Sequence, residues 1–217
     1  MSILKNQLDE NINFSAIITH ELQKPLTIIK GKIDVLLLKT RSENEYIKAL
    51  KEIVIEVQNH SKIIESLQTL DNINVSKYNL VNVDLEVLVE KINCSAFELI
   101  LIGENFIIKG NETLLEIAFN NIVENAEKYG KNKPIKVLLT KEKNLIKIEF
   151  IDNGMGINKE DLKQVGSIFY RSAKVKNIEG NGIGLYLVNK IVAFHHGAMQ
   201  VSSTENEGTT VTLKFSI

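Results

Sequence analysis

Residues 14–27 read Phe-Ser-Ala-Ile-Ile-Thr-His-Glu-Leu-Gln-Lys-Pro-Leu-Thr, and they place a histidine inside a helical pattern. Apolar residues recur there at the spacing of one helix face: Ile17, Ile18, Leu22, Leu26 and Ile29. His20 is followed directly by Glu21 and, five residues on, by Pro25. Proline lacks the N–H that bonds the carbonyl four residues back, which costs about 3 kcal/mol in a helix interior. We therefore interpret the bend expected beside this histidine–acid pair as a feature of a functional site.

The pair His20–Glu21 has the chemistry of an activated nucleophile. Neutral imidazole keeps one nitrogen free to attack, and a neighbouring carboxylate can hold that tautomer and stabilise the charge that develops. For these two residues alone, a solvated histidine beside a solvated glutamate is the alternative. The whole stretch, however, resembles the phosphoacceptor box of sensor histidine kinases, Phe-x-x-x-x-(Ser/Thr)-His-Glu-Leu-x-x-Pro-Leu. Seven residues fill that pattern: Phe14, Thr19, His20, Glu21, Leu22, Pro25 and Leu26. The resemblance implies that His20 is phosphorylated and that Glu21 assists.

Composition narrows the class of protein. The 217 residues suffice for one large domain or two small ones, and 44% hydrophobic with 24% charged residues is ordinary for a globular protein. A net charge of −1 gives no electrostatic footprint for nucleic acid. The single cysteine, Cys94, excludes an intrachain disulfide and is compatible with a reducing compartment. Neither a signal peptide nor an apolar run of roughly 20 residues is visible. The sequence predicts a cytoplasmic chain, with any membrane attachment through a sensor segment absent from it.

The first 70 residues have the period of two helices. The pattern predicts one helix over residues 1–40, a polar break at 40–45 and a second helix to about residue 70, which make an antiparallel hairpin. A single hairpin cannot bury both apolar stripes, so we expect a homodimer that forms a four-helix bundle. His60, in the second helix, has no adjacent acid or proline and is interpreted as structural or solvated.

Residues 71–79 are polar and break the helical period, so they predict a linker ahead of a second domain at 80–217. There the pattern mixes the two periods. Helices are expected at 85–97, 112–129 and 183–195, and strands near 81–83, within 99–108, and at 135–140, 145–151, 198–203 and 209–217. The range 157–181 reads as irregular. Histidines 195 and 196 end the last expected helix before Gly197; no third ligand accompanies them, so we interpret them as a helix C-terminus and not as a metal site.

Three further stretches carry chemistry. Asn121, Asn125 and Lys128 share one face of the helix at 112–129, where an amide oxygen and a lysine can serve Mg²⁺ and phosphates; a solvated face is the alternative.

Residues 152–157 read Asp-Asn-Gly-Met-Gly-Ile directly after a strand. A carboxylate there can accept from the exocyclic amine of adenine, where guanine has an acceptor, whereas a simple Asx-type turn is the alternative. Residues 180–185, Gly-Asn-Gly-Ile-Gly-Leu, open a helix as phosphate-binding loops do. A Rossmann loop would need a strand immediately before it.

In this order, the three stretches resemble the N, G1 and G2 boxes of the GHKL (Bergerat-type) ATP-binding fold, and Gly208-Thr209-Thr210 resembles its G3 element. The resemblance implies an α/β sandwich that binds ATP at residues 80–217. It implies that Asn125 binds Mg²⁺, that Lys128 meets the phosphates and that Asp152 binds the adenine amine. The full ATP-binding set that it implies is Asn121, Asn125, Lys128, Tyr129, Asp152, Gly154, Gly156, Ile157, Arg171, Gly180, Gly182, Ile183, Gly184, Leu185 and Thr210.

Two positions depart from the family. Gly166 stands where the lid motif Phe-x-x-Phe-Tyr-Arg has its first phenylalanine, although Arg171 remains available for phosphate. Lys24 stands four residues after His20, where many members with phosphatase activity carry threonine or asparagine. Lysine offers only donors, so we expect poor dephosphorylation of a partner.

Taken together, the sequence predicts a two-component histidine kinase core, with ATP and Mg²⁺ as cofactors and a response regulator as partner. A GHKL ATPase is the first alternative, but it would carry a glutamate base in place of Asn121. A non-catalytic dimeric scaffold that binds ATP is the second.

Overall fold

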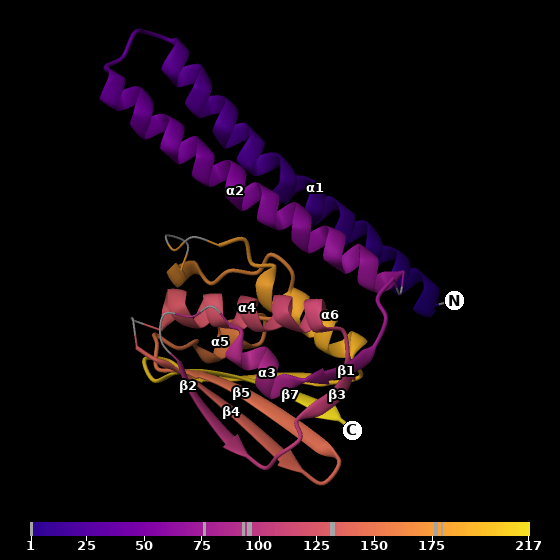
Figure 1. Ribbon diagram of the computed structural model, residues 1–217. Helices are drawn as coiled ribbons and strands as arrows, with labels where there is room; N and C mark the ends of the chain where they lie inside the picture. The colour runs from indigo at the N-terminus through magenta and orange to yellow at the C-terminus, as the bar shows by residue number, and fades with distance from the viewer. Residues whose placement is uncertain are drawn as a thin grey trace. The chain divides into compact units, whose positions relative to one another are not determined.

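The computed structural model describes residues 2–75, 77–92, 94, 97–130, 133–175, 178 and 180–217, with side chains from residue 15 onward and Asn74 excepted (Figure 1). The side chain of Phe14 in the phosphoacceptor box thus lies outside the described part. The chain divides into two compact units, Met1–Leu67 and Gln68–Ile217. Each is described by itself.

Two long helices form the hairpin, as predicted: α1 (Ser2–Leu37) and α2 (Glu43–Asn74). The second helix continues to Asn74 and so enters the range expected as a linker. Ser42 and Glu45 form a reciprocal capping box at the start of α2, in which the Ser42 backbone N–H donates to Glu45 Oε2 at 2.9 Å and Ser42 Oγ lies 3.4 Å from the Glu45 backbone N. The Ser42 backbone N–H and the Ser42 hydroxyl, which donates to Glu45 Oε2 at 2.7 Å, lower the pKa of Glu45. The capping box fixes where the chain turns back into the second helix.

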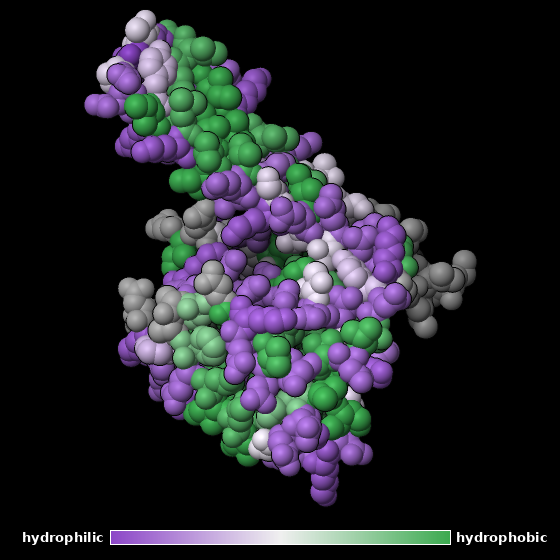
Figure 2. Space-filling model, in the orientation of Figure 1, coloured by the Kyte–Doolittle hydropathy of each residue, from purple (hydrophilic) through white to green (hydrophobic). Residues whose placement is uncertain are grey.

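The hairpin buries little of its own apolar surface. Among the described side chains of residues 15–67, only Pro25 and Ile63 are buried. Large apolar side chains left exposed lie along both helices: Ile17, Leu26, Ile28, Ile33, Val35, Leu37, Leu38, Ile47, Leu50, Val54, Ile55, Val57 and Ile64. Figure 2 shows hydrophobic residues gathered along the hairpin on the face it draws. This much exposed apolar surface is typical of a surface that another chain covers.

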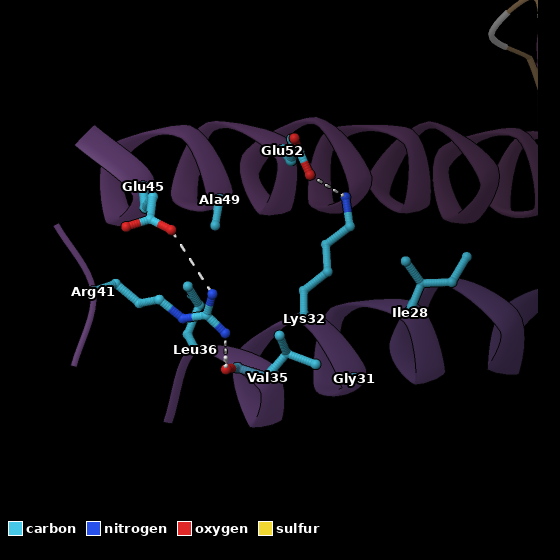
Figure 3. A pocket seen from close by; sticks show the side chains of 9 residues that line it. All are labelled: Ile28, Gly31, Lys32, Val35, Leu36, Arg41, Glu45, Ala49 and Glu52. Atoms are coloured by element: carbon cyan, nitrogen blue, oxygen red, sulfur yellow. Dashed lines mark hydrogen bonds and ion pairs between the residues drawn. The ribbon is translucent and has the colours of Figure 1, made fainter. Parts of the chain in front are cut away.

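Near the loop end, residues of the two helices line an open pocket of about 480 Å³ (Figure 3). Apolar atoms of Ile28, Val35 and Leu36 form part of its wall, and the Lys32 ammonium bridges the helices to Glu52 at 3.0 Å. Arg41 donates to the Val35 carbonyl at 3.1 Å in the last turn of α1. The pocket does not include His20, so it is a feature of helix packing and not of the phosphoacceptor box.

The second unit is built on a five-stranded mixed sheet in the order β2-β4-β5-β7-β6. Its strands are β2 (Phe97–Ile102), β4 (Ile135–Glu142), β5 (Leu145–Asp152), β7 (Gly208–Ser216) and β6 (Ala198–Thr204). Only the β2–β4 pair is parallel. Strands β1 (Val81–Asp84) and β3 (Ile107–Gly110) form a separate antiparallel pair. The predicted helical hairpin followed by a mixed α/β domain is confirmed.

Helices α4 (Glu112–Tyr129) and α6 (Gly184–Phe194) lie side by side on one face of the large sheet (Figure 1). Ile146, Ile148 and Phe150 alternate toward that face and are fully buried, as the period of two predicted. The Phe150 ring lies 5.4 Å from that of Phe119 on α4. The same alternation brings Asp152, the last residue of β5, to the side of the sheet that the helices cover.

One predicted helix was too long. The range 85–97 is helical only in α3 (Leu85–Glu90), and Phe97 already begins β2. The apolar residues from 97 onward pair in parallel with β4, starting at Ile135, and a partner so distant in sequence leaves no mark on the local helical period. The irregular range 157–181 does contain two short helices, α5 (Lys159–Leu162) and the 3-10 turn η1 (Ala173–Val175).

Candidate functional site

Helix α4 divides cleanly into a buried and a polar face. Its start is capped by the side chain of Asn111, which accepts from the Leu114 N–H at 3.0 Å. Seven of its residues are buried against the sheet and α6: Leu114, Leu115, Ala118, Phe119, Ile122, Val123 and Ala126. On the other face Asn121 and Asn125 are half-buried, and Lys128 is exposed. Asn121 Nδ2 donates to the Ile117 carbonyl at 2.8 Å, and its amide oxygen faces the start of α6.

The amides of α4 lie directly beside the N-terminus of α6. A Cβ placed on Gly184 would lie 2.9 Å from Asn121 Oδ1 and 3.6 Å from Asn125 Nδ2. Ile183, the N-cap residue, makes no side-chain hydrogen bond to the first turn of α6. Since no side-chain cap is found for this eleven-residue helix among the described residues, its first N–H groups can bind an anion, which the helix dipole also favours. The structure thus joins the two stretches that the sequence singled out for phosphate and magnesium.

The loop after β5 is held by the end of α4. The Met155 N–H donates to the Tyr129 carbonyl at 3.1 Å, and a side chain at Gly154 would collide with that same carbonyl. Asp152 Oδ1 accepts the backbone N–H groups of Gly154, at 2.8 Å, and Thr209, at 3.3 Å. In the described part of the chain both bonds use Oδ1, so Oδ2 is left to accept from a ligand. Burial raises the pKa of Asp152 above its ordinary value.

The second glycine of this loop has a backbone that only glycine adopts readily. Gly156 has φ +63°, and a Cβ there would collide with the Thr204 carbonyl. The next residue, Ile157, donates its N–H to Ser203 Oγ at 2.8 Å, and the Met155 carbonyl accepts from Asn206 at 2.7 Å. The loop is therefore attached to the β6–β7 hairpin on one side and to α4 on the other.

The phosphoacceptor box lies in the middle of α1. His20 is exposed, and its Nδ1 lies 3.3 Å from Glu21 Oε1. Lys24 Nζ donates to the same oxygen. Pro25, inside the helix, is buried. Because Nδ1 faces the carboxylate, Nε2 is the ring nitrogen left for a reaction.

The comparisons with known proteins agree with this geometry. Residues 110–217 match the family model described as "Histidine kinase-, DNA gyrase B-, and HSP90-like ATPase". These residues belong to that family. Over 99% of the chain, the sequence is 30% identical to the heme sensor protein HssS of Staphylococcus saprophyticus. It is 29% identical over 97% of the chain to the signal transduction histidine-protein kinase ArlS of Staphylococcus epidermidis. The chain spans about half the length of these relatives, 49% and 50% respectively.

A solved structure shows the same fold in both units. It is the histidine kinase ThkA in complex with the response regulator protein TrrA. The match covers 98% of this chain and 63% of the chain in that structure, with a TM-score of 0.73 and 21% identity. The family model and the named relatives confirm the predicted resemblance to a sensor histidine kinase core, and the solved structure shows its fold. No helix in the described residues is both long and apolar enough to cross a membrane.

The predicted lid motif falls in the stretch between α5 and α6, whose described residues are tied to the glycine-rich loop before α6. Phe169, with φ +59°, donates its N–H to the Gly182 carbonyl at 2.8 Å, and Gly182 itself has φ +71°. Arg171 donates to the carbonyls of Val175, at 2.8 Å, and Ile178. The side chain expected for phosphate is thus engaged in shaping the lid. Gly180 is exposed, and Leu185 is half-buried at the start of α6.

The strand register distinguishes the two threonines of the predicted G3 element, Thr209 and Thr210. Asp152 pairs with Thr209, and Ile151 with Thr210. Since successive side chains on a strand point to opposite faces, Thr210 lies on the face away from Asp152. Thr209 and Ser203, whose hydroxyl oxygens are 2.9 Å apart, lie beside the loop instead. Sequence reasoning missed Ser203 and chose Thr210 in place of Thr209 within the G3 element, because only the β5–β7 register distinguishes the two threonines.

The family implies a magnesium ion, and the side chains present fit an ion that is held partly by the nucleotide. Mg²⁺ prefers oxygen ligands, keeps several waters and is commonly held through nucleotide phosphates. Asn125 offers one amide group beside the N-terminus of α6. Within the described residues no group of three or more His, Cys, Asp or Glu side chains could hold a metal. The site therefore suits an ion that arrives with a nucleotide.

Of the other histidines, His195 has a structural role. His195 is buried; its Nδ1 lies 2.7 Å from the Ile191 carbonyl, and its Nε2 accepts the Asn111 N–H at 2.9 Å. This histidine therefore connects the end of α6 to the start of α4. Burial lowers the pKa of His195, and His196 beside it lowers it further. His60 Nδ1 is buried without a hydrogen-bond partner among the described atoms.

Proposed function

We propose that this chain is the catalytic core of a two-component sensor histidine kinase, which transfers the γ-phosphoryl group of ATP to His20 and then to an aspartate of a response regulator. One observation carries the proposal. Asn121 and Asn125 lie beside the N-terminus of α6 at Gly184, the Tyr129 carbonyl one turn further along α4 holds the loop that follows Asp152, and the same chain presents His20 beside Glu21 on an exposed helix face.

Each part of the nucleotide has a partner of suitable chemistry. Asp152 Oδ2 would accept the adenine amine, while Gly154 and Gly156 leave the main chain bare beside the ring. The N–H groups at the start of α6 and the Lys128 ammonium would meet the phosphates. Asn125 would hold Mg²⁺, which neutralises charge on the phosphates when it is bound. The wider ATP-binding set given by the resemblance, including Tyr129, Ile157, Gly180 and Ile183, is part of this proposal.

The transfer requires a nucleophilic nitrogen and a nearby carboxylate on the helix. The lone pair of His20 Nε2 attacks the γ-phosphorus, the bond from phosphorus to the β,γ-bridging oxygen breaks, and its electrons leave with ADP. The positive charge that develops on the ring is met by Glu21, 3.3 Å from Nδ1, which can accept the Nδ1 proton. Positioning supplies the remainder, because phosphoryl transfer requires little covalent chemistry from the protein.

Assembly and location follow from the same proposal. Exposed apolar side chains along α1 and α2 support a homodimer with a four-helix bundle. We propose a hairpin at residues 1–70, a linker at 71–79 and a catalytic domain at 80–217. The response regulator in the ThkA complex supports a regulator as partner. We place the core in the cytoplasm, and membrane attachment would need a segment outside this chain. A GHKL-type hydrolase is disfavoured because Asn121 cannot take a proton from water.

The test is incubation of the purified chain with Mg²⁺ and labelled ATP. We expect one acid-labile, base-stable phosphoryl group, absent from His20→Gln and present in the matched control His60→Gln. His60 lies on the second helix of the same hairpin and has no adjacent carboxylate in sequence. Label retained in His20→Gln would refute the assignment of the phosphoacceptor, and no label in the wild type would refute the kinase proposal itself.

A further inference from the structure

One carboxylate oxygen on α1 serves two neighbours. Glu21 Oε1 lies 3.3 Å from His20 Nδ1 and also accepts from Lys24 Nζ. His20 and Lys24 are four residues apart, so they are stacked on the same face of the helix with the carboxylate between them. The phosphoacceptor therefore has a cation, Lys24, three residues beyond its acid partner and paired with the same carboxylate oxygen.

The Lys24 ammonium can readily leave the Glu21 carboxylate for another anion. Side-chain exposure is 52% for Lys24 and 69% for His20, so both head groups face solvent. Exposed ion pairs between flexible side chains are weak, because water already solvates both charges. Glu21, at 25% exposure, is the better anchored of the three. Lys24 can leave this carboxylate at little cost if a stronger anion forms nearby.

Phosphorylation of His20 creates such an anion. A phosphoryl group carries about −1.5 to −2 charges at pH 7 and three strong acceptor oxygens. Neighbours four residues apart on a helix have Cβ atoms about 5–6 Å apart, well within reach of the four-carbon stem of lysine. At the same time Glu21 takes on the ring proton and no longer offers Lys24 a full negative charge.

We propose that Lys24 is the counter-ion of the phosphohistidine, and that its ammonium moves from Glu21 to the phosphoryl oxygens as the group is transferred. The inference rests on the proposed function. The balance of the step is that given above: the phosphorus–nitrogen bond forms, the bond to the ADP oxygen breaks, and the Nδ1 proton passes to Glu21. Lys24 remains protonated throughout. It stabilises the product and thereby shifts the equilibrium of ATP plus histidine toward ADP plus phosphohistidine.

The first experiment measures that equilibrium in the full chain. Phosphorylated fraction is followed at fixed ratios of ATP to ADP for the wild type, Lys24→Gln and Lys24→Arg, with Lys30→Gln as the control on an exposed lysine of the same helix. Attraction between a cation and a phosphoryl group across roughly 5 Å near water predicts an equilibrium constant about five- to tenfold lower in Lys24→Gln. Arginine should restore most of it, Lys30→Gln should leave it unchanged, and high salt should shrink the difference.

The second experiment does not need kinase activity. Histidines of the chain are phosphorylated with phosphoramidate, and the ³¹P signal missing from His20→Gln is titrated with pH. A nearby ammonium favours the dianion, so the titration midpoint should rise by about 0.5 pH units in Lys24→Gln but not in Lys24→Arg. An unchanged midpoint and an unchanged equilibrium would overturn the counter-ion role. Absence of ATP-dependent label with a shifted midpoint would instead refute the proposed function and leave the contact between Lys24 and the phosphoryl group supported.

Discussion

Replacement of Asp152 by asparagine separates ligand binding from folding. In the wild type, Oδ1 accepts the N–H groups of Gly154 and Thr209, and an amide oxygen can accept both equally well. The amide NH₂ then takes the place of Oδ2 and presents donors to the adenine amine, itself a donor. Loss of one hydrogen bond to a charged group is worth about 1.5–3 kcal/mol, so the Kd for ATP should rise roughly ten- to a hundredfold.

Stability should not fall with it. Burial raises the pKa of Asp152 above its ordinary value of 3.8, which means that the folded state disfavours the charge. A raised acid pKa contributes stability below the unfolded pKa and loses it as pH rises, so at pH 7 a neutral amide removes a cost. We expect a Tm for Asp152→Asn at or above that of the wild type. For the same reason, ATP affinity of the wild type should decline as pH falls toward the raised pKa, whereas the variant should show no such decline.

The assay is calorimetric titration with ATP and GTP, beside thermal unfolding. Asp84→Asn is the matched control, since Asp84 also ends a strand and accepts a backbone N–H, that of Glu86 at 3.0 Å. We expect Asp84→Asn to leave ATP affinity unchanged and Asp152→Asn to lose the preference for ATP over GTP. Wild-type affinity for ATP in a folded Asp152→Asn chain would refute the assignment of Asp152 to the adenine.

Three further outcomes are expected. Gly184→Ala should weaken ATP binding about tenfold, because its Cβ would press on Asn121 Oδ1. The control Gly166→Ala, whose Cβ would have nothing within 4 Å, should leave ATP binding unchanged. Equal ATP affinities of the two variants in titration would contradict this reasoning. Thermal stability should fall as pH drops below about 6.5, because the lowered pKa of His195 makes its protonation in the folded state unfavourable. The change of Tm with pH should be smaller in His195→Gln. An equal change of Tm with pH in the variant would exclude His195 as its source. Lys24→Thr should gain phosphatase activity toward a phosphorylated regulator, since threonine can orient a water and lysine offers only donors; rapid decay with the wild type would show that Lys24 is no obstacle.

Local signals predicted the fold where the chain itself supplies them. The helix expected at 112–129 matches α4 at both ends, because Asn111 provides the cap and the apolar period is complete. The helix expected at 85–97 failed beyond Glu90, where pairing with a strand nearly forty residues away determines the conformation. The number of strands in one sheet, their order and the single parallel pair likewise depend on contacts that no local window contains.

The candidate site shows the same division. Asn121, Asn125, Asp152 and the glycines were recognisable because their residue types and spacing carry the chemistry. Thr209 and Ser203 were not, since serine and threonine are common on strands and only the sheet register places these two beside the loop. The carbonyl of Tyr129 belongs to the main chain, and a sequence motif cannot reveal what a carbonyl accepts.

The Tyr129 carbonyl limits which substitutions could exclude a ligand from this part of the site. Near Asp152 the loop is walled by main-chain atoms: the carbonyls of Tyr129 and Thr204 lie where side chains at Gly154 and Gly156 would have to fit. A point mutation changes side chains, and at these two glycines any side chain collides with the backbone opposite. Few single substitutions would therefore exclude a ligand that contacts only this part of the site and still allow the loop to form. Substitutions that do so would have to lie at the periphery, in the lid or on the exposed face of α4.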